Sequence, residues 1–567
     1  MSSKYKIADQ VFLKKQKDVL RLFKNVMQPS AYEDIIEIAE NFKFEDRWDQ
    51  WTEPEEIKHF WKCFNNNFLK INDTFNVYYP EHSRQCRSLI SIFIYAKDYA
   101  TFFRCAAWSR QNINACMFVY VLSVALVHTT FTKGIILPPI YEILPQHFYN
   151  ESKTVANSNV KNNIDYLTED VGYNSYYHYK HVYVARILEN NVMYVDADRR
   201  GDYFYYYHTQ IMARHHLELL SNGRAEAKKI NYNDFSGRNV SKDFLPKIIE
   251  LERRICEAID IGWAYDKNGN KKSLRDVDSL RTLGKIIEDD PDSPNQEYYG
   301  NFQYYARYLL GNHSLKHYET SMSDPLFYNF IKNILDLFVR YQYRMGPYSK
   351  LDLLFDGVKI NDFIIDKLVT FFDLFTYDSS NGLVQQKRLN HKPFTYKIHV
   401  KSNTSVDAVV KFYIGPKLAD FASMDDNRLN FFELDRFTIR LNEGDNVIER
   451  NSDDIVFFSP DRFGYSEFCN KIDDALSGKE PFKRFPYYNY YTFPRRLMLP
   501  KGDVSGQQFQ VFVAILQQRS LPTDDFEFQV VDKTYSIGFP LDRPILYKED
   551  FWVPNFFSKE VNIFHES

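Results

Sequence analysis

Apolar residues recur at helical spacing along the chain up to about residue 375. The segments DVLRLFKNV, DYATFFRCAAWSRQ and DYFYYYHTQIMARHHLELLSNG place apolar side chains three or four positions apart, which predicts helices with one buried face. The last of these segments ends on Gly223, a residue type that commonly follows the final turn of a helix. This part of the chain is therefore predicted to be mostly α-helical.

Beyond residue 390 the pattern changes to strict alternation of apolar and polar residues. The segments FTYKIHV, FTIRL and FQVFVAI alternate in this way, which is typical of strands with one buried face. Turn sequences such as NEGDN and LPKGDVSG separate the predicted strands. Short strands joined by such turns predict an antiparallel β-sandwich or barrel.

These patterns divide the chain into three predicted domains, in agreement with its length of 567 residues. The proline-rich segment KGIILPPIYEILPQHF ends one set of helices near residue 150, and the change of periodicity marks the second boundary. The fold class is multidomain α+β. We predict a helical N-terminal domain (1–150), a helical middle domain (151–378) and a β domain (379–567).

Composition excludes several classes of protein and adds one unusual feature. The net charge of -4 gives no basic surface, so a nucleic-acid partner is not expected. The longest apolar run, ACMFVYVLSVALV, is shorter than the ~20 residues of a membrane span and predicts a buried helix. The unusual feature is 48 phenylalanines and 42 tyrosines, more than a core requires, which indicates either a large aromatic core or selection on amino-acid content itself.

Cysteine usage and the first residues bear on cofactors and on location. The six cysteines are scattered without CxxC spacing, which argues against a cysteine zinc site or a disulfide scaffold. The opening MSSKYKIADQVFLKKQKDVL has no apolar stretch of the secretory kind, so we expect either a cytosolic protein or one whose signal has been removed.

The segment EDVGYNSYYHYKHVYVARIL contains the strongest candidate for metal chemistry. Tyr177 and His181 are four residues apart and share one helical face, and His208 on the next predicted helix could join them. Such residues could hold a metal ion. Histidines in an aromatic helix are nevertheless more often hydrogen-bonded packing residues, and this applies also to His178. No GxSxG, HExxH, P-loop or dinucleotide motif occurs in a suitable context.

Many longer motifs make the chain resemble the insect hexamerins, in particular the aromatic-rich arylphorins, of the arthropod hemocyanin and prophenoloxidase superfamily. The resemblance extends from end to end. It rests on RQNIN, LPPIYEILP, YLTEDVG, FYYYHTQIMARHHLELLSNG, HYETSMSDPLFY, LLFDGVKI, DKLVTFFD, LNHKPFTYKIHVKS, NFFELDRF, FPRRLMLPKG and GFPLDRPI. It implies that six chains assemble into a hexamer. It also implies that the C-terminal domain of each chain is immunoglobulin-like.

Oxygen-binding and phenol-oxidising members of the superfamily hold two copper ions, each by three histidines of the middle domain. Alignment on EDVG places the first copper's ligands at Tyr177, His181 and His208. The second copper's positions fall on Gln303, Arg307 and Ile331, none of which is a histidine. A coupled copper pair needs neutral imidazoles on both ions. We therefore expect no metal and no cofactor, with His181 and His208 tied into tyrosine hydrogen bonds and Arg307 paired with a carboxylate or carbonyl.

The resemblance implies a non-enzymatic store of aromatic amino acids, held in hemolymph and fat-body granules as a homo- or hetero-hexamer and taken up by a fat-body receptor. The alternative is a carrier of a small apolar ligand such as a hormone, bound between domains. If the chain is secreted, its glycosylation sequons could carry glycans. They are Asn72, Asn150, Asn239, Asn312 and Asn403.

Overall fold

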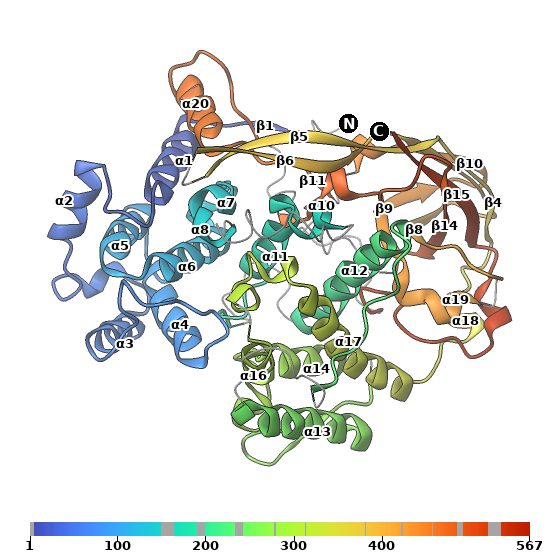
Figure 1. Cartoon of the computed structure of the whole chain (residues 1–567), viewed down its shortest axis with the longest axis horizontal. Coiled ribbons are helices and arrows are strands. Elements are labelled where there is room, and N and C mark those ends of the chain that lie inside the picture. The colour runs from blue at the N-terminus through green and yellow to red at the C-terminus, as the bar shows by residue number, and fades with distance from the viewer. Residues whose placement is uncertain are drawn as a thin grey trace.

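The computed structural model describes residues 5–148, 164–189, 199–232, 242–276, 279–311, 313–379, 382–420, 423–455, 458–484, 491–519 and 535–566. Figure 1 shows helices of the N-terminal part on the left, helices of the middle part below the centre, and β-sheets on the right. Buried apolar side chains from all three parts belong to one continuous core. Among the described residues, no helix combines the length and apolar character needed to cross a membrane.

The N-terminal part consists of helices, most of which begin at side-chain caps or prolines. Asp9 and Asp98 accept hydrogen bonds from backbone amides of α1 and α5, each at 2.7 Å. The predicted buried helix is confirmed as α6, in which every residue from Met117 to His128 is buried. The main helices are α1 (Gln10–Phe23), α2 (Glu33–Asn41), α3 (Pro54–Asn65), α4 (Pro80–Ile94), α5 (Tyr99–Asn112) and α6 (Ala115–His128).

The middle part is also helical. The predicted end of its longest helix is confirmed, because Gly223 follows α12 in a left-handed conformation with φ of +63°. A small hairpin of β2 (Trp263–Tyr265) and β3 (Lys271–Ser273) follows helix α13 (Leu245–Ile261) and contacts it. The helices are α7 (Ile140–Ile143), α8 (Pro145–Phe148), α10 (Asp165–Thr168), α11 (Val171–Tyr183), α12 (Arg200–Ser221), α13 (Leu245–Ile261), α14 (Ser279–Glu288), α15 (Gln296–Tyr299), α16 (Phe302–Leu309), α17 (Pro325–Met345) and α18 (Lys350–Leu353).

The C-terminal part contains a six-stranded sheet in the order β6-β5-β15-β14-β8-β9 and a three-stranded sheet in the order β10-β7-β4. Burial alternates along β7 as predicted, with Tyr396, Ile398 and Val400 inside. The central strand β14 is buried on both faces over most of its length. The strands are β4 (Val358–Ile365), β5 (Leu368–Ser379), β6 (Gly382–His391), β7 (Thr395–Ser402), β8 (Val406–Pro416), β9 (Phe432–Leu441), β10 (Gly444–Asn451), β14 (Gln507–Gln517) and β15 (Phe556–Glu566).

Two details differ from the sequence prediction. The expected start of the β domain at residue 379 is too late, because β4 and β5 precede it and pair with β7, β15 and β6. The sandwich is also not entirely antiparallel, since β15 and β5 run parallel from Ile563↔Leu368 to Glu566↔Phe371. The other expected boundary, at residue 150, lies outside the described residues.

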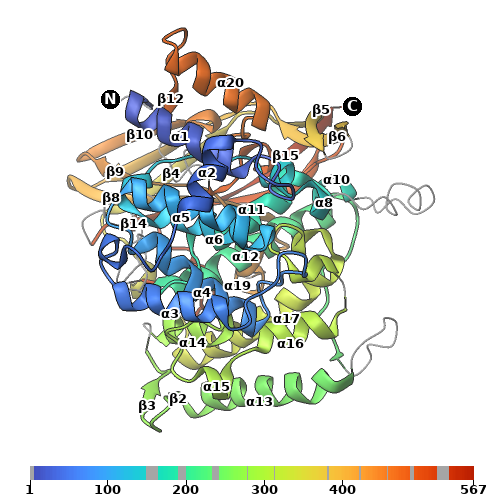
Figure 2. The same cartoon turned by 90° about the vertical axis from the view of Figure 1, so that its left-hand side faces the viewer.

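Two C-terminal segments extend over the helical parts and contact them, so the three parts do not simply follow one another along one axis. The long hairpin of β5 and β6 runs along the top of the molecule toward the N-terminal helices, as Figure 1 shows. Its Tyr377 ring lies 5.2 Å from that of Tyr141 on α7. Helix α20 (Tyr465–Leu476) packs on α1, and the neighbouring β12 (Lys483–Arg484) pairs with β1 (Lys6–Ile7). The first residues of the chain therefore lie beside a segment of the C-terminal part, as Figure 2 shows near the label N.

All six cysteines are free in the structure, in agreement with the absence of a disulfide pattern. Cys86 and Cys105 are buried, and burial raises the pKa of the Cys86 thiol to about 12. These thiols pack as small apolar side chains.

Candidate functional site

The six positions that correspond to copper ligands lie on four helices of the middle part. All six side chains are buried, as their relative exposures are at most 4%. Helix α11 carries the first two, α12 the third, α16 the next two and α17 the last. In that order the residues are Tyr177, His181, His208, Gln303, Arg307 and Ile331.

The two histidines are held in one tautomer by the backbone of their own helices. Nδ1 of His181 lies 2.8 Å from the Tyr177 carbonyl, and Nδ1 of His208 lies 2.9 Å from the Phe204 carbonyl. Because a carbonyl oxygen only accepts, each Nδ1 must carry the proton. The lone pair that could bind a metal is therefore on Nε2 in both rings.

Both of these lone pairs accept hydrogen bonds from tyrosine hydroxyls. The Tyr207 hydroxyl donates to Nε2 of His181 over 3.0 Å. The Tyr177 hydroxyl lies 3.2 Å from Nε2 of His208 and donates to it. The Tyr318 ring additionally stacks on His181, with centroids 3.8 Å apart. Neither imidazole thus offers a free nitrogen to an ion at this place.

Arg307 fills the region of the second set of positions. Its Nη2 donates to the Tyr177 hydroxyl at 3.2 Å, and its Nη1 donates to the Leu315 carbonyl at 2.9 Å and to Ser321 Oγ at 3.1 Å. The guanidinium also lies 4.1 Å above the Tyr78 ring. The chain of donors runs from Arg307 through Tyr177 to His208, so the site is a closed hydrogen-bond network around a buried cation.

The electrostatics of this network oppose metal binding. Burial, together with the charge of Arg307, lowers the pKa of His208 to about 3, and burial lowers the pKa of His181 well below its ordinary value. Burial raises the pKa of Tyr177, although the adjacent guanidinium counteracts part of the rise. A phenol must lose its proton to serve as a good ligand. The residues present therefore do not fit a copper pair, because Arg307 repels a cation and Ile331 has no donor atom.

The buried neutral imidazole of His208 predicts a specific pH dependence. Its pKa is about 3 in the folded chain and about 6.5 in the unfolded chain, so the unfolded state binds the proton first. The stability that a neutral His208 provides is therefore complete above pH 6.5 and is lost as the pH falls toward 3. At pH 5 the loss is about 2 kcal/mol. Burial raises the pKa of Glu288 to about 8, so the contribution of this group to the free energy of unfolding increases as the pH falls, opposite to that of His208.

A comparison with His208→Gln isolates this contribution from that of other groups. We expect the variant to melt below the parent at pH 7, because it loses the hydrogen bond from Tyr177. The difference in melting temperature should shrink as the pH falls from 7 to 5. A difference that stays constant over this range would show that His208 is not held neutral by the fold. The measurement is thermal unfolding followed by circular dichroism at each pH.

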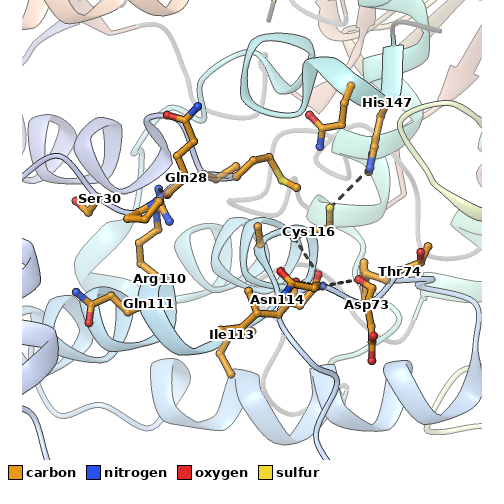
Figure 3. A pocket seen from close by; sticks show the side chains of 18 of the residues that line it. Gln28, Ser30, Asp73, Thr74, Arg110, Gln111, Ile113, Asn114, Cys116 and His147 are labelled. Atoms are coloured by element: carbon orange, nitrogen blue, oxygen red, sulfur yellow. Dashed lines mark hydrogen bonds between the residues drawn. The ribbon is translucent and has the colours of Figure 1, made fainter.

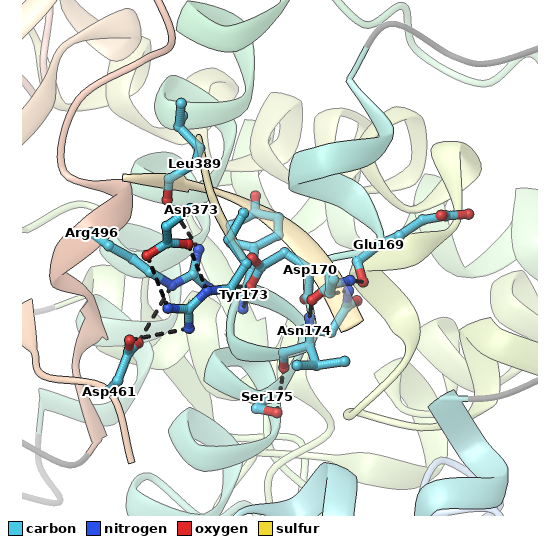
Figure 4. A network of polar contacts seen from close by, with 12 residues as sticks. Glu169, Asp170, Tyr173, Asn174, Ser175, Asp373, Leu389, Asp461 and Arg496 are labelled. Atoms are coloured by element: carbon cyan, nitrogen blue, oxygen red, sulfur yellow. Dashed lines mark hydrogen bonds and ion pairs between the residues drawn. The ribbon is translucent and has the colours of Figure 1, made fainter. Parts of the chain in front are cut away.

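The helix that carries Tyr177 and His181 is anchored to the C-terminal part by a buried ion pair. Asp170 caps α11 by accepting from the Tyr173 amide at 2.8 Å, and its carboxylate pairs with the Arg496 guanidinium (Figure 4). A Cβ atom on Gly172 would lie 2.8 Å from Arg496 Nη2, so a larger residue there would displace the guanidinium. In this chain, EDVG thus holds the start of α11 and FPRRLMLPKG supplies the counter-charge.

Sequence reasoning missed a second cluster, which lies between α8, α11 and the segment around η6 (His313–Lys316). His147 Nδ1 lies 2.6 Å from Glu319 Oε1, and His317 and His178 approach the same carboxylate. Burial alone would lower the pKa of His147, but hydrogen bonds to Cys116 and Glu319 raise it to about 10. The only local signal was the four-residue spacing of His313 and His317 in NHSLKHYET.

Two of the expected glycosylation positions can be placed. Asn72 and Asn403 are exposed, as a glycan requires. The other three, Asn150, Asn239 and Asn312, lie outside the described residues.

Family models match the chain over most of its length. The hemocyanin all-alpha domain matches residues 12–134, the hemocyanin copper containing domain matches residues 146–239 and 233–338, and the hemocyanin ig-like domain matches residues 347–565. The start of the last match agrees with the position of β4.

Similar solved structures share the fold. The activated state of a scorpion hemocyanin superposes with a TM-score of 0.80 at 23% identity and covers 98% of this chain and 100% of that one. A hemolymph-type prophenoloxidase from a crustacean superposes with a TM-score of 0.74 at 19% identity and covers 97% of this chain and 96% of that one. At these identities the likeness is one of fold.

Relatives found by sequence include insect proteins that share a higher identity with this chain than these two solved structures do. Hexamerin 70b of Apis mellifera is 30% identical, over 95% of this chain and 92% of the relative. The arylphorin subunit alpha of Manduca sexta is 29% identical, over 98% of this chain and 92% of the relative. With matches of this extent, the chain belongs to the insect hexamerins of the hemocyanin superfamily.

Proposed function

We propose that this hexamerin is an amino-acid store, rich in phenylalanine and tyrosine, that holds no copper pair and catalyses no reaction. The hydrogen-bond network at the six former ligand positions is the observation that carries this proposal. Both imidazole Nε2 atoms accept from tyrosines, and Arg307 fills the remaining space with a fixed positive charge. The chain thus has the hemocyanin fold, while side chains fill the positions at which two copper ions would bind oxygen.

Composition supports storage independently of the site. The chain contains 48 phenylalanines and 42 tyrosines but only 9 methionines, so its degradation releases mainly aromatic residues. Much of this content is packed into the core, as the buried tyrosines of α11 and α12 show. Close packing of this kind protects the backbone from proteases until the protein is taken up and digested.

We expect the chain to assemble into a closed particle of six subunits. A few large particles contribute little osmotic pressure for the mass of amino acids that they hold, and closed symmetry prevents further growth. Sedimentation in neutral buffer should therefore give a mass near six chains of 67.5 kDa each. Related subunits could take some of the six places. A stable monomer at micromolar concentration would contradict the proposal.

The proposed location is hemolymph, followed by uptake through a fat-body receptor and deposition in granules. The exposed positions of Asn72 and Asn403 support passage through a secretory route, where glycans are added. Mobility shifts after glycosidase treatment of the native protein test this directly.

The alternative function, transport of a small apolar ligand, predicts that such a ligand co-purifies. A large groove of about 930 Å³ lies between the N-terminal and middle helices. Its wall combines apolar side chains such as Met27, Ile71 and Phe75 with polar ones such as Asp73 and Arg110, so ligand analysis rather than the groove decides between the two functions. We expect mass spectrometry of solvent extracts to show no stoichiometric organic ligand. One ligand per subunit that also raises the melting temperature would favour transport.

A further inference from the structure

Four polar side chains converge at the seam between α8, α11 and the segment that joins η6 to η7 (Ser321–Ser323). Ligand atoms of His147, His317 and Glu319 all lie within 4.8 Å of one another. Oε1 of Glu319 is 2.6 Å from His147 Nδ1 and 4.0 Å from His317 Nδ1. The second carboxylate oxygen lies 3.6 Å from His178 Nδ1. This cluster is separate from the six positions discussed above and shares no residue with them.

Two ring nitrogens of the cluster make no hydrogen bond among the described residues. His317 Nε2 has no partner, and His178 Nδ1 lies just beyond hydrogen-bond distance of Glu319 Oε2, at 3.6 Å; the two side chains are only 4% and 3% exposed. A buried polar atom without a partner costs about 1–3 kcal/mol, so such atoms are rare unless a ligand, an ion or a water completes them. The His147–Glu319 ion pair alone does not account for either nitrogen.

The cluster opens into the large groove, which gives a ligand a route from solvent. His147, His313 and His317 line this groove together with Cys116. Figure 3 shows the His147 side chain pointing toward Cys116. The His313 ring lies on the solvent side, 4.7 Å from the His317 ring. Cys116 Sγ is 3.7 Å from His147 Nε2. A ligand that enters the groove would meet imidazoles and a nearby thiol, and the Glu319 carboxylate lies directly behind, 2.6 Å from His147 Nδ1.

We propose that His147, His317 and Glu319 bind one divalent transition-metal ion of the zinc class, with a water molecule from the groove as a further ligand. Two imidazoles and a carboxylate are a donor set that suits such ions better than Ca²⁺ or Mg²⁺, which prefer oxygen alone. In a tetrahedral zinc site the ligand atoms are about 3.3 Å apart. The three ligand atoms lie within 4.8 Å of one another, and the 2.6 Å between Glu319 Oε1 and His147 Nδ1 must widen to admit an ion, so binding requires side-chain rotation.

The site would also tie parts of the molecule together. His147 belongs to α8, whereas His317 and Glu319 lie in a distant segment of the chain. The separation between His147 and Glu319 is 172 residues. An ion shared by them takes the place of the proton in the His147–Glu319 pair. His178 on α11 then holds the other carboxylate oxygen in position. Metal binding is therefore expected to stabilise the folded state.

Zinc titration of the full-length hexameric protein tests the proposal. After removal of bound metal with a chelator, isothermal titration with ZnCl₂ should give one site per chain, and zinc should raise the melting temperature. His317→Gln and Glu319→Gln should each weaken binding at this site by at least about 100-fold, because even groups that only support metal ligands are worth about 10- to 100-fold. His399→Gln, which alters a half-buried histidine on β7, should leave binding unchanged.

Further measurements keep the result interpretable if a variant is unstable. X-ray absorption at the zinc edge of the parent protein should show nitrogen and oxygen neighbours that include two imidazoles. Sedimentation of each variant without metal shows whether it still assembles. Loss of binding in His208→Gln but not in His317→Gln would move the site to the former copper position and overturn the proposal. Binding of well under one zinc per chain, or binding that survives both His317→Gln and Glu319→Gln, would overturn it as well.

Discussion

Replacing Asp170 with alanine is expected to destabilise the folded protein by about 3–5 kcal/mol, because Arg496 would remain buried without the carboxylate that neutralises it. Asp170 is fully buried and Arg496 is 6% exposed. A second carboxylate near Arg496 belongs to Asp461, at 3.4 Å, and that side chain is half exposed and therefore a weaker partner. The substitution also removes the cap of α11, which contributes about 1 kcal/mol.

The effect is measured as the shift of the thermal or urea unfolding transition of the assembled protein. Asp407→Ala is a matched control, because it breaks the Arg440–Asp407 pair, whose side chains are 59% and 54% exposed. Exposed pairs contribute about 0–1 kcal/mol. A double variant, Asp170→Leu with Arg496→Met, should recover part of the loss by removing both charges. Equal shifts for Asp170→Ala and Asp407→Ala would contradict the role assigned to the buried pair.

Much of the fold could be predicted because individual segments show the spacing of apolar residues that is typical of a helix or of a strand. The helical spacing of DYFYYYHTQIMARHHLELLSNG and the alternation of FTYKIHV correspond to α12 and β7. The start of the β domain was misplaced because β5 lies partly over the helices and partly at the surface. Its burial along LVTFFDLFTYDS is therefore irregular and does not alternate cleanly.

The candidate sites could be predicted from the sequence only in part. Resemblance placed Tyr177, His208 and Arg307 at related positions, and side-chain chemistry then indicated that copper would not fit. The tautomers of the histidines depend on carbonyls of the same helix and could have been anticipated from i, i+4 geometry. The pairing of His147 with Glu319 could not, because 172 residues separate them and no local pattern connects the two.

The second large effect concerns copper and phenol oxidation. Restoring one ligand by Tyr177→His should not create oxygen binding, because Gln303, Arg307 and Ile331 still supply no imidazole for a second ion. The variant also removes the hydroxyl that donates to His208 and accepts from Arg307. We expect it to melt at a lower temperature than the parent and to remain colourless with added copper in air. Reversible oxygen binding by this single variant would contradict our description of the network.

Elemental analysis of the native protein, combined with a diphenol oxidation assay, tests the central claim most directly. The protein is purified without added metal and assayed before and after treatments that activate latent phenol oxidases. We predict far less than one copper per chain, no copper–oxygen charge-transfer absorption in air and no turnover of diphenols. Two tightly bound copper ions per chain, or diphenol turnover that purifies with the protein, would contradict the account.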